Sequence, residues 1–294
     1  MCGLTTLYCD VDDFWKSFHP EWNKHLLESN KSKRGPDPEL SIPEIITIVV
    51  LFHQSNYRTF KHFYIDHVQK YLRKEFPALI SYTRFVAIKK TIFVPLFAYA
   101  LHLQGITTGI GFVDATSIKV CSNKRIKRNK VFKGLAKIGR TTTGWFYGFK
   151  LHLIINEKGE ILAFQITPGN VSDISVLESL SKGIYGKIFG DKGYISSKIC
   201  ENLLKKGIHL FTTIRNNMKQ KLMSLKDKIL LRKRSIIETV NDQLKNISQI
   251  EHSRHRGVGN FLVNLLAGII AYSRRPKKPS LNLDDDDLYL LSRD

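Results

Sequence analysis

The chain has 294 residues, of which 43% are hydrophobic, so it is long enough for one main globular domain and a smaller one. Lysine and arginine number 46 against 26 aspartate and glutamate residues, which gives a formal net charge of +20 at pH 7. This charge favours a polyanionic partner, because basic surfaces neutralise phosphates and release counterions. Nucleic acid and an anionic membrane surface both meet that description.

The apolar stretches favour nucleic acid over a membrane. The longest two, Ile45–Phe52 and Phe261–Tyr272, are too short to cross a bilayer. The first residues, Cys2–Asp13, contain three aspartates where a signal sequence would have an apolar run. We therefore expect a cytoplasmic protein that does not act on membranes.

Residues 1–105 are predicted to form a helical, DNA-binding domain, because apolar residues recur there every three or four positions. Ser41-Ile42-Pro43-Glu44 fits a capping box and predicts that a helix begins there. Lys31–Pro38 is predicted to be a linker. Tyr57–Tyr64 interleaves basic and aromatic residues, which either lie against DNA or form the buried face of an amphipathic helix.

Residues 106–275 are predicted to form a second, α/β domain, followed by a polar tail at 276–294 that holds the acidic run Asp284–Asp287. A hairpin turn is expected at Asn156–Glu160. The predicted strands are Gly111–Val120, Phe146–Ile155, Ile161–Thr167, Lys187–Gly190 and His209–Ile214. The predicted helices are Ser175–Gly183, Ser196–Lys206, Ser235–Asn246 and Gly259–Tyr272.

This order of elements predicts a mixed sheet, in which three antiparallel strands are followed by parallel strands with flanking helices. In the simplest layout, the fourth strand lies beside the first, and their ends meet at a topological switch point where ligands of open sheets bind.

Two carboxylates belong to these two central strands. Asp114 interrupts an apolar strand. Burying a carboxylate there without a partner would cost on the order of several kcal/mol of folding free energy. Asp191 follows the fourth strand directly, and Glu238 on a later helix would reach them in one packing of that helix. Hard oxygen ligands of this kind suit Mg²⁺, with Mn²⁺ as the alternative ion, and two such ions can activate and cleave a phosphodiester. The alternative is three unrelated carboxylates.

The motifs around these residues resemble the DDE transposases of bacterial insertion sequences over residues 108–273. They are Asp114-Ala115-Thr116, Gly169-Asn170-Val171-Ser172-Asp173, Asp191-Lys192-Gly193-Tyr194 and the spacing Arg234-x3-Glu238-x6-Lys245. The resemblance implies an RNase H-like catalytic domain with Asp114, Asp191 and Glu238 as catalytic metal ligands, and cleavage and strand transfer at terminal inverted repeats. The chain departs from the family pattern at Leu231, where the motif has tyrosine.

Basic residues near these motifs are candidates for DNA contacts. Residues 119–140 contain nine lysines and arginines and no acidic residue, so this run is expected to follow a DNA backbone, with a solvated loop as the alternative. Arg234 and Lys245 are implied to contact DNA by the resemblance; otherwise they form ion pairs on a solvated helix. The candidate DNA-binding residues are Lys124, Arg125, Lys127, Arg128, Lys130, Arg234 and Lys245.

Three further residues are less specific. Asp173 sits in the Gly-Asn-x-Ser-Asp loop, where it serves the catalytic edge or is a helix N-terminal residue favoured by the helix dipole. Lys150 and His152 alternate onto one strand face, where they approach substrate, or His152 is a core histidine with its hydrogen bonds satisfied.

The expected function is that of a nucleoid-associated transposase acting on double-stranded DNA, both the terminal inverted repeats and the target. A dimer on the DNA ends is expected from the resemblance. The alternatives are a catalytically silent DNA-binding protein derived from such an element, and a nuclease without strand transfer. The repeat sequence, the target preference and the excision pathway have no signal in the sequence.

Overall fold

The computed structural model describes residues 3–28, 39–142, 144–213, 223–251, 255–283 and 291. The predicted linker Lys31–Pro38 and the acidic run Asp284–Asp287 lie outside the described residues, as does Ile214 of the predicted fifth strand. The chain divides into two compact units. Unit 1 consists of Met1–Leu103 and Leu244–Pro276, and unit 2 of Gln104–Gln243 and Lys277–Asp294.

The boundary between the units begins close to the predicted one at residue 105, but the first segment of unit 2 ends at Gln243, whereas the predicted domain extends over 106–275. Residues 244–276 are compact with unit 1 instead. The division into a DNA-binding domain, a catalytic domain and a polar tail concerns roles that compactness does not test, so it stays a prediction.

The described residues of unit 1 form helices joined by turns. They are α1 (Leu4–Glu28), α2 (Ile42–Gln54), α3 (Phe60–His62), η1 (Phe63–Val68), α4 (Gln69–Tyr71), α5 (Tyr82–Ile88), η2 (Lys89–Ile92), α6 (Phe93–His102) and α11 (Val258–Ser273). A π-helical turn, η5 (Gln243–Ile247), begins at the last residue of the first segment of unit 2.

The capping box predicted at Ser41 is confirmed as the start of α2. The Ser41 backbone N–H donates to Glu44 Oε2 over 2.7 Å, and the Glu44 N–H donates back to Ser41 Oγ over 3.4 Å. Two N–H groups that the first helical turn leaves without partners are thereby satisfied. The apolar run that follows is mostly buried and supplies much of the core of unit 1.

The aromatic residues near Phe60 form the buried face of a helical segment, as one of the two interpretations predicted. Phe63 and Tyr64 are fully buried. The Phe60 ring packs edge-on against Phe52 at 5.4 Å and stacks on Phe85 at 5.5 Å between ring centroids. These aromatics therefore serve the core, while exposed basic neighbours such as Lys61 face away from it.

One helical run in unit 1, Tyr82–His102, has the length and apolar composition of a membrane-spanning helix. Core helices of soluble proteins pass the same test, and Phe85, Ile92 and Leu96 of this run are fully buried. The run is thus weak evidence for a membrane span, and the expectation of a protein without a membrane role stays a prediction.

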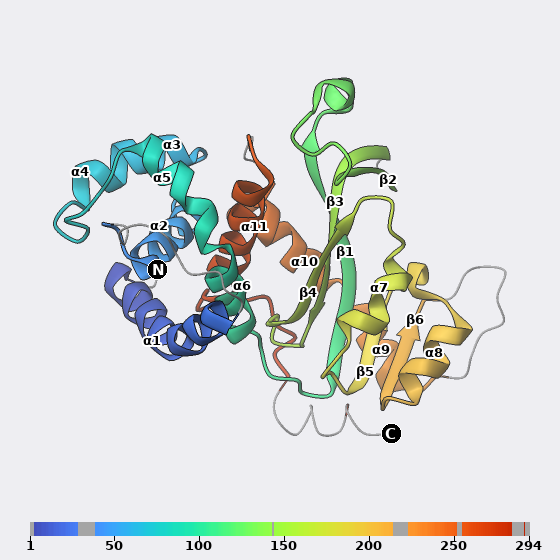
Figure 1. Ribbon diagram of the computed structural model, residues 1–294. Helices are drawn as coiled ribbons and strands as arrows, with labels where there is room; N and C mark the ends of the chain where they lie inside the picture. The colour runs from blue at the N-terminus through green and yellow to red at the C-terminus, as the bar shows by residue number, and fades with distance from the viewer. Residues whose placement is uncertain are drawn as a thin grey trace. The chain divides into compact units, whose positions relative to one another are not determined.

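Unit 2 is a mixed α/β structure (Figure 1). Its strands are β1 (Ile110–Cys121), β2 (Lys137–Thr141), β3 (Gly144–Ile155), β4 (Ile161–Pro168), β5 (Gly186–Gly190) and β6 (Ile208–Thr212). Its helices are η3 (Asn123–Arg128), α7 (Asp173–Leu180), η4 (Lys192–Tyr194), α8 (Ser197–Leu204), α9 (Leu225–Lys233) and α10 (Ile236–Asp242).

The predicted sheet topology is confirmed in its central part. The order is β2-β3-β1-β5-β6, with β4 paired to β3. β1 runs antiparallel to β3 and parallel to β5, so the strand that follows α7 lies beside the first strand, as expected. β2 and α9 were not predicted. All but the last residue of β2 belong to the basic run 119–140, for which no strand was expected, and the structure pairs β2 with β3.

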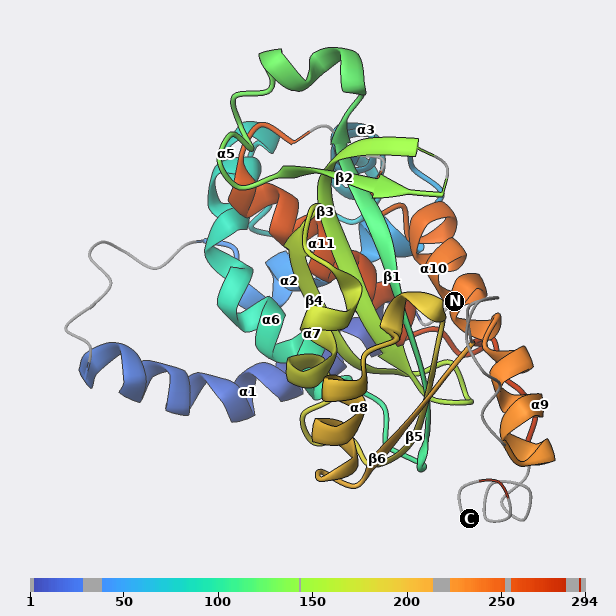
Figure 2. The same cartoon turned by 90° about the vertical axis from the view of Figure 1, so that its right-hand side faces the viewer.

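Helices cover the sheet on both faces, with α7 and α8 to one side of the strands and α9 and α10 to the other (Figure 2). On the first face, Val113, Ile154 and Ile188 pack with Leu177 of α7 and Leu203 of α8. On the second face, the buried Lys187 pairs with Asp227 of α9 over 3.1 Å. The sheet is therefore buried in its centre.

The predicted hairpin turn between β3 and β4 is confirmed. Asn156 Oδ1 accepts the backbone N–H groups of Lys158 and Glu160 over 3.0 and 2.9 Å. Gly159 has a φ of +69°, which favours glycine over residues with a side chain. This turn fixes the register of β3 against β4.

Candidate active site

Asp114 lies in the central strand β1, opposite Leu153 of β3. The pKa of its carboxyl is raised to about 6. Burial is the main cause, the Ala115 N–H and Arg234 act against it, and the charges of Asp191 and Glu238 add to it. The other two predicted catalytic carboxylates are therefore close enough to act on Asp114 electrostatically. Such a group favours a cation beside it.

Asp191 directly follows β5, in the position that the sequence predicted. Phe112 of β1 pairs with Phe189 of β5, so Asp114 and Asp191 each lie two residues beyond the same rung of the sheet. Asp191 caps η4, because its Oδ1 accepts the Gly193 N–H over 2.8 Å. The expectation that these two carboxylates lie on adjoining strands is confirmed; their catalytic role stays a prediction.

Glu238 is carried by α10, and a neighbour on that helix ties α10 to the sheet. Asn241 Nδ2 donates to Asp114 Oδ2 over 2.9 Å. Glu238 lies three residues earlier, about one helical turn. Its Oε1 accepts from Arg234 Nη2 over 3.0 Å, which confirms contact between two residues of the predicted Arg-x3-Glu spacing. The Glu238 side chain remains 57% exposed, so it is free to turn towards a substrate or ion.

The three carboxylates do not form a closed metal cage. Among the described residues, no three His, Cys, Asp or Glu side chains converge as a preformed metal site. The donors nevertheless suit a hard divalent ion, because all are oxygens. Asn241 Oδ1 is also buried without a hydrogen-bond partner among the described residues, next to the amide nitrogen that contacts Asp114. Asp114, Asp191 and Glu238 thus fit such an ion in chemistry.

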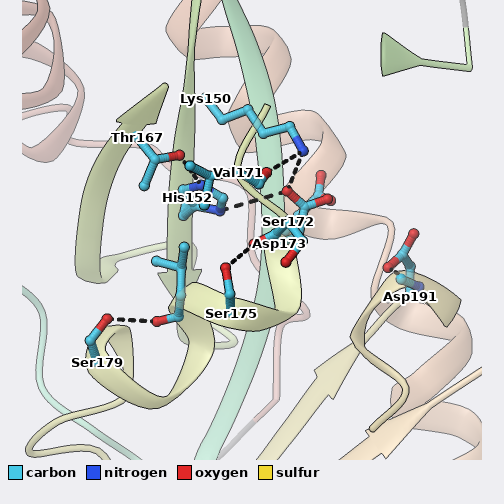
Figure 3. Close-up of polar contacts among 12 residues, drawn as sticks. Lys150, His152, Thr167, Val171, Ser172, Asp173, Ser175, Ser179 and Asp191 are labelled. Carbon is cyan, nitrogen blue, oxygen red and sulfur yellow. Dashed lines mark hydrogen bonds and ion pairs between the residues drawn. The ribbon is translucent and has the colours of Figure 1, made fainter. Parts of the chain in front are cut away.

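A second polar group, formed by Lys150, His152 and Asp173, lies where β3 meets the loop before α7 (Figure 3). Lys150 Nζ donates to Asp173 Oδ1 over 2.8 Å and to the Val171 carbonyl over 3.0 Å. Asp173 is the first residue of α7, after the N-cap Ser172. Its charge is thus matched by a lysine, which makes it an anchor for this loop.

His152 is a core residue, as one of the two interpretations predicted, but only one of its ring nitrogens has a hydrogen-bond partner among the described residues. Its Nε2 lies 2.8 Å from Thr167 Oγ1, and the residue is 1% exposed. Burial lowers its pKa to about 4, although Asp173 raises it. Nδ1 has no hydrogen-bond partner among the described residues, since Asp173 Oδ1 is 3.9 Å away.

Tyr194 is a residue that the sequence analysis quoted only as part of a motif. Its ring packs on Gly190, where an added Cβ would lie 3.1 Å from the ring. Its hydroxyl is buried with no hydrogen-bond partner among the described residues. Burial raises the pKa of this hydroxyl, and so do the charges of Asp114, Asp173 and Asp191. The hydroxyl therefore lies near these three aspartates. The signal available in the sequence was the position of this tyrosine three residues after Asp191 in the same motif.

The candidate DNA-binding residues fall in three places. Five of them are exposed on or just after η3, a helical turn that was not predicted: Lys124, Arg125, Lys127, Arg128 and Lys130. Arg234 lies beside Glu238 in unit 2. Lys245 belongs to unit 1, where its Nζ lies 3.7 Å from a Glu251 carboxylate oxygen. That these residues contact DNA stays a prediction.

An open mixed sheet with helices on both faces and acidic residues at a switch point defines the class of α/β enzymes that bind substrate at strand ends. A family model described as transposase DDE domain matches residues 104–258, more than half of the chain. The chain therefore belongs to the transposase DDE domain family, whose members are DNA-processing enzymes of transposition and recombination. A search of curated proteins finds no match.

Proposed function

We propose that this transposase cleaves DNA at the ends of its element and joins the freed 3′ hydroxyl to target DNA, with Asp114, Asp191 and Glu238 as metal ligands. The observation that carries the proposal is the position of Asp114 and Asp191 beyond one paired rung of adjoining strands, with Glu238 on the helix that Asn241 ties to Asp114. Carboxylates brought to one edge of the sheet repel one another unless a cation lies among them.

The protein side of the mechanism follows from these contacts. When bound, Mg²⁺ or Mn²⁺ would activate the attacking oxygen and stabilise the leaving oxygen of the phosphodiester. Asp114 is oriented by the Asn241 amide, and Asp191 by the Gly193 N–H. Arg234 balances the charge of Glu238 until the carboxylate is needed as a ligand, and its guanidinium is then free to meet a phosphate.

In unit 2, the basic residues of η3 and the segment after it, together with Arg234, are proposed to contact the DNA duplex. Lys245 of unit 1 is proposed as a separate DNA contact. Lysine and arginine contacts to phosphates position a duplex without reading its sequence. Binding should therefore weaken steeply as salt increases. We further propose that the mixed sheet is RNase H-like, that residues 1–105 bind DNA, and that the protein is a nucleoid-associated dimer when it holds two DNA ends.

The central experiment replaces one proposed ligand while keeping its shape. Asp191→Asn should bind end DNA with unchanged affinity and fail to nick it with Mg²⁺. Glu201→Gln, which alters an exposed carboxylate of α8 in the same unit, is the matched control and should cleave normally. Undiminished cleavage by Asp191→Asn would refute the assignment of this residue.

Two further assays separate the alternatives. A supercoiled plasmid incubated with the wild-type protein and Mn²⁺ should be nicked, whereas binding without nicking would identify a silent DNA-binding protein. Pre-cleaved end DNA should be joined to a target plasmid. Nicking without any joined product would identify a nuclease that lacks strand transfer.

A further inference from the structure

The start of β3 exposes a large aromatic side chain beside a guanidinium group. Trp145 is 61% exposed, although most large aromatics of unit 2 are buried. It pairs across the ladder with Arg140 of β2, so the two side chains share one face of the ribbon. The Arg140 guanidinium lies 5.5 Å from the centre of the Trp145 ring, within cation–π distance.

Trp145 belongs to a segment, residues 122–145, that we call the basic arm. The arm contains eight lysines and arginines and no acidic residue. It also exposes apolar side chains in addition to Trp145: Val131, Leu135 and Ile138, which are 36%, 49% and 49% exposed. Figure 1 shows that the helical turn η3 lies beyond the ends of the strands that carry it. A surface that is both basic and aromatic calls for an anionic partner with apolar faces.

The exposure of Trp145 is built into the fold. Asn123 Nδ2 donates to the Trp145 carbonyl over 2.9 Å, which fixes the start of η3 to the start of β3. Further along β3, the Tyr147 hydroxyl donates to the Phe132 carbonyl over 3.2 Å, and the Phe132 ring packs edge-on against Phe149 at 5.8 Å. The described part of the arm is thus held by a small core of its own, and the indole stays outside it.

The charge of the arm decides among the partners that an exposed indole could contact. A second copy of this chain would bring the same eight positive charges against the first, which is unfavourable. Nucleic acid supplies phosphates for the basic residues and flat rings for the indole. Bases inside a duplex are already stacked on one another and are hidden from a side chain, whereas unpaired bases stack readily on aromatic and guanidinium planes.

We propose that Trp145 and Arg140 form a stacking platform for an unpaired nucleobase of the DNA that the enzyme processes. The inference rests on the proposed function in one respect, namely that DNA is the substrate. It adds that the arm holds DNA whose strands are separated. Trp145 precedes Leu153, the residue opposite Asp114, by eight residues, which places the platform about 25 Å along the strand from the cleavage centre.

The test compares DNA binding of Trp145→Ala with that of the wild-type protein on two substrates. One is a fully paired duplex, and the other carries a single-stranded tail of about ten nucleotides, long enough to span about 25 Å at roughly 3.4 Å per stacked nucleotide. We expect Trp145→Ala to lose about five- to tenfold in affinity for the tailed substrate and less than twofold for the duplex, measured by fluorescence anisotropy in EDTA. A tail of two nucleotides should show no difference between the proteins.

Tyr185→Ala is the matched control, because Tyr185 is an aromatic residue of unit 2 that is 55% exposed and lies outside the arm. It should bind both substrates as the wild type does. A direct readout uses Trp15→Phe/Trp22→Phe protein, in which Trp145 is the remaining tryptophan. Its fluorescence should be quenched by the tailed substrate and far less by the duplex.

Three results would overturn the proposal: equal losses on the two substrates, no loss on either, or tighter binding of the arm to anionic phosphatidylglycerol vesicles than to tailed DNA, abolished by Trp145→Ala. Failure of the proposed function would look different. In that case Asp191→Asn would leave cleavage intact, while the binding difference of Trp145→Ala in EDTA would be unaffected.

Discussion

Asn241 Nδ2 donates a hydrogen bond to Asp114 Oδ2 over 2.9 Å, which joins α10 to the central strand of the sheet. The two residues are 127 positions apart in the chain. This contact holds Glu238, one turn earlier on the same helix, within electrostatic reach of Asp114. Asn241 therefore has a positioning role for the candidate active site, separate from that of the carboxylates.

Asn241→Ala should lower DNA cleavage about tenfold or more and reduce the free energy of unfolding by about 1–3 kcal/mol, because a partly buried carboxylate loses its donor. Cleavage of end DNA and urea unfolding measure the two effects. Thr239→Ala, on the exposed face of the same helix, is the control and should change neither by much. Wild-type cleavage by Asn241→Ala would remove the positioning role.

Asp114→Asn should abolish cleavage and yet stabilise the fold without metal. The folded state raises the pKa of Asp114 to about 6 from 3.8, so above that range the ionised carboxyl costs folding free energy. We expect the variant to be more stable by about 1–3 kcal/mol at pH 8, with the gain shrinking towards pH 4. Urea unfolding in EDTA at both pH values tests this, and a loss of stability at pH 8 would contradict it.

Removing one partner of the buried pair Lys187 and Asp227 should lower the free energy of unfolding strongly, whereas replacing both partners with apolar residues should change it little. Both side chains are at most 5% exposed. Lys187→Met or Asp227→Leu alone leaves an uncompensated buried charge and should cost about 3–5 kcal/mol. The double variant should lie within about 2 kcal/mol of the wild type, because two apolar residues leave no such charge. Urea unfolding of the two single variants and the double variant completes this double-mutant cycle. Additive losses in the free energy of unfolding would show that the two side chains are not coupled.

Stability should fall on mild acidification, because burial lowers the pKa values of His53 and His152 to about 4 from 6.5. Between these values the unfolded chain binds protons that the folded chain does not, so stability is complete above pH 6.5 and is lost as pH falls towards 4. Each histidine should contribute a loss of about 2 kcal/mol at pH 5.

Urea unfolding at pH 7.5 and pH 5 measures the difference. His53→Asn should make the protein less sensitive to pH, and replacement of the exposed His209 should not. An unchanged pH dependence in His53→Asn would mean that other groups dominate acid sensitivity.

The sequence predicted the parts of the fold that local chemistry determines. Three structures could be predicted from a few neighbouring residues each: the Ser41–Glu44 capping box, the Asn156 turn and the apolar strand around Asp114. The juxtaposition of Asp114 and Asp191 also followed, because a strand after a crossover helix returns parallel to its neighbour.

The missed features depend on contacts that are distant in sequence. β2 is an exposed edge strand rich in basic residues, so it lacks the alternation that marks a half-buried strand. Asn241 resembles any polar residue of a solvated helix until α10 packs on β1. Trp145 gave no signal either, because exposure of an aromatic residue is a property of the finished surface.

The pairing of β1 has a consequence for the solubility of this protein. β1 is paired with β3 along most of its length, whereas its pairing with β5 ends at Phe112. Beyond Phe112, the edge of β1 that faces β5 has no paired strand in the described sheet. Backbone groups on the open side of a strand are a template for adding another strand, and hence for aggregation. Here Lys119 lies on this part of β1 and the basic arm follows it. Positive charge on this part of the strand and on the arm should therefore keep copies of the protein apart.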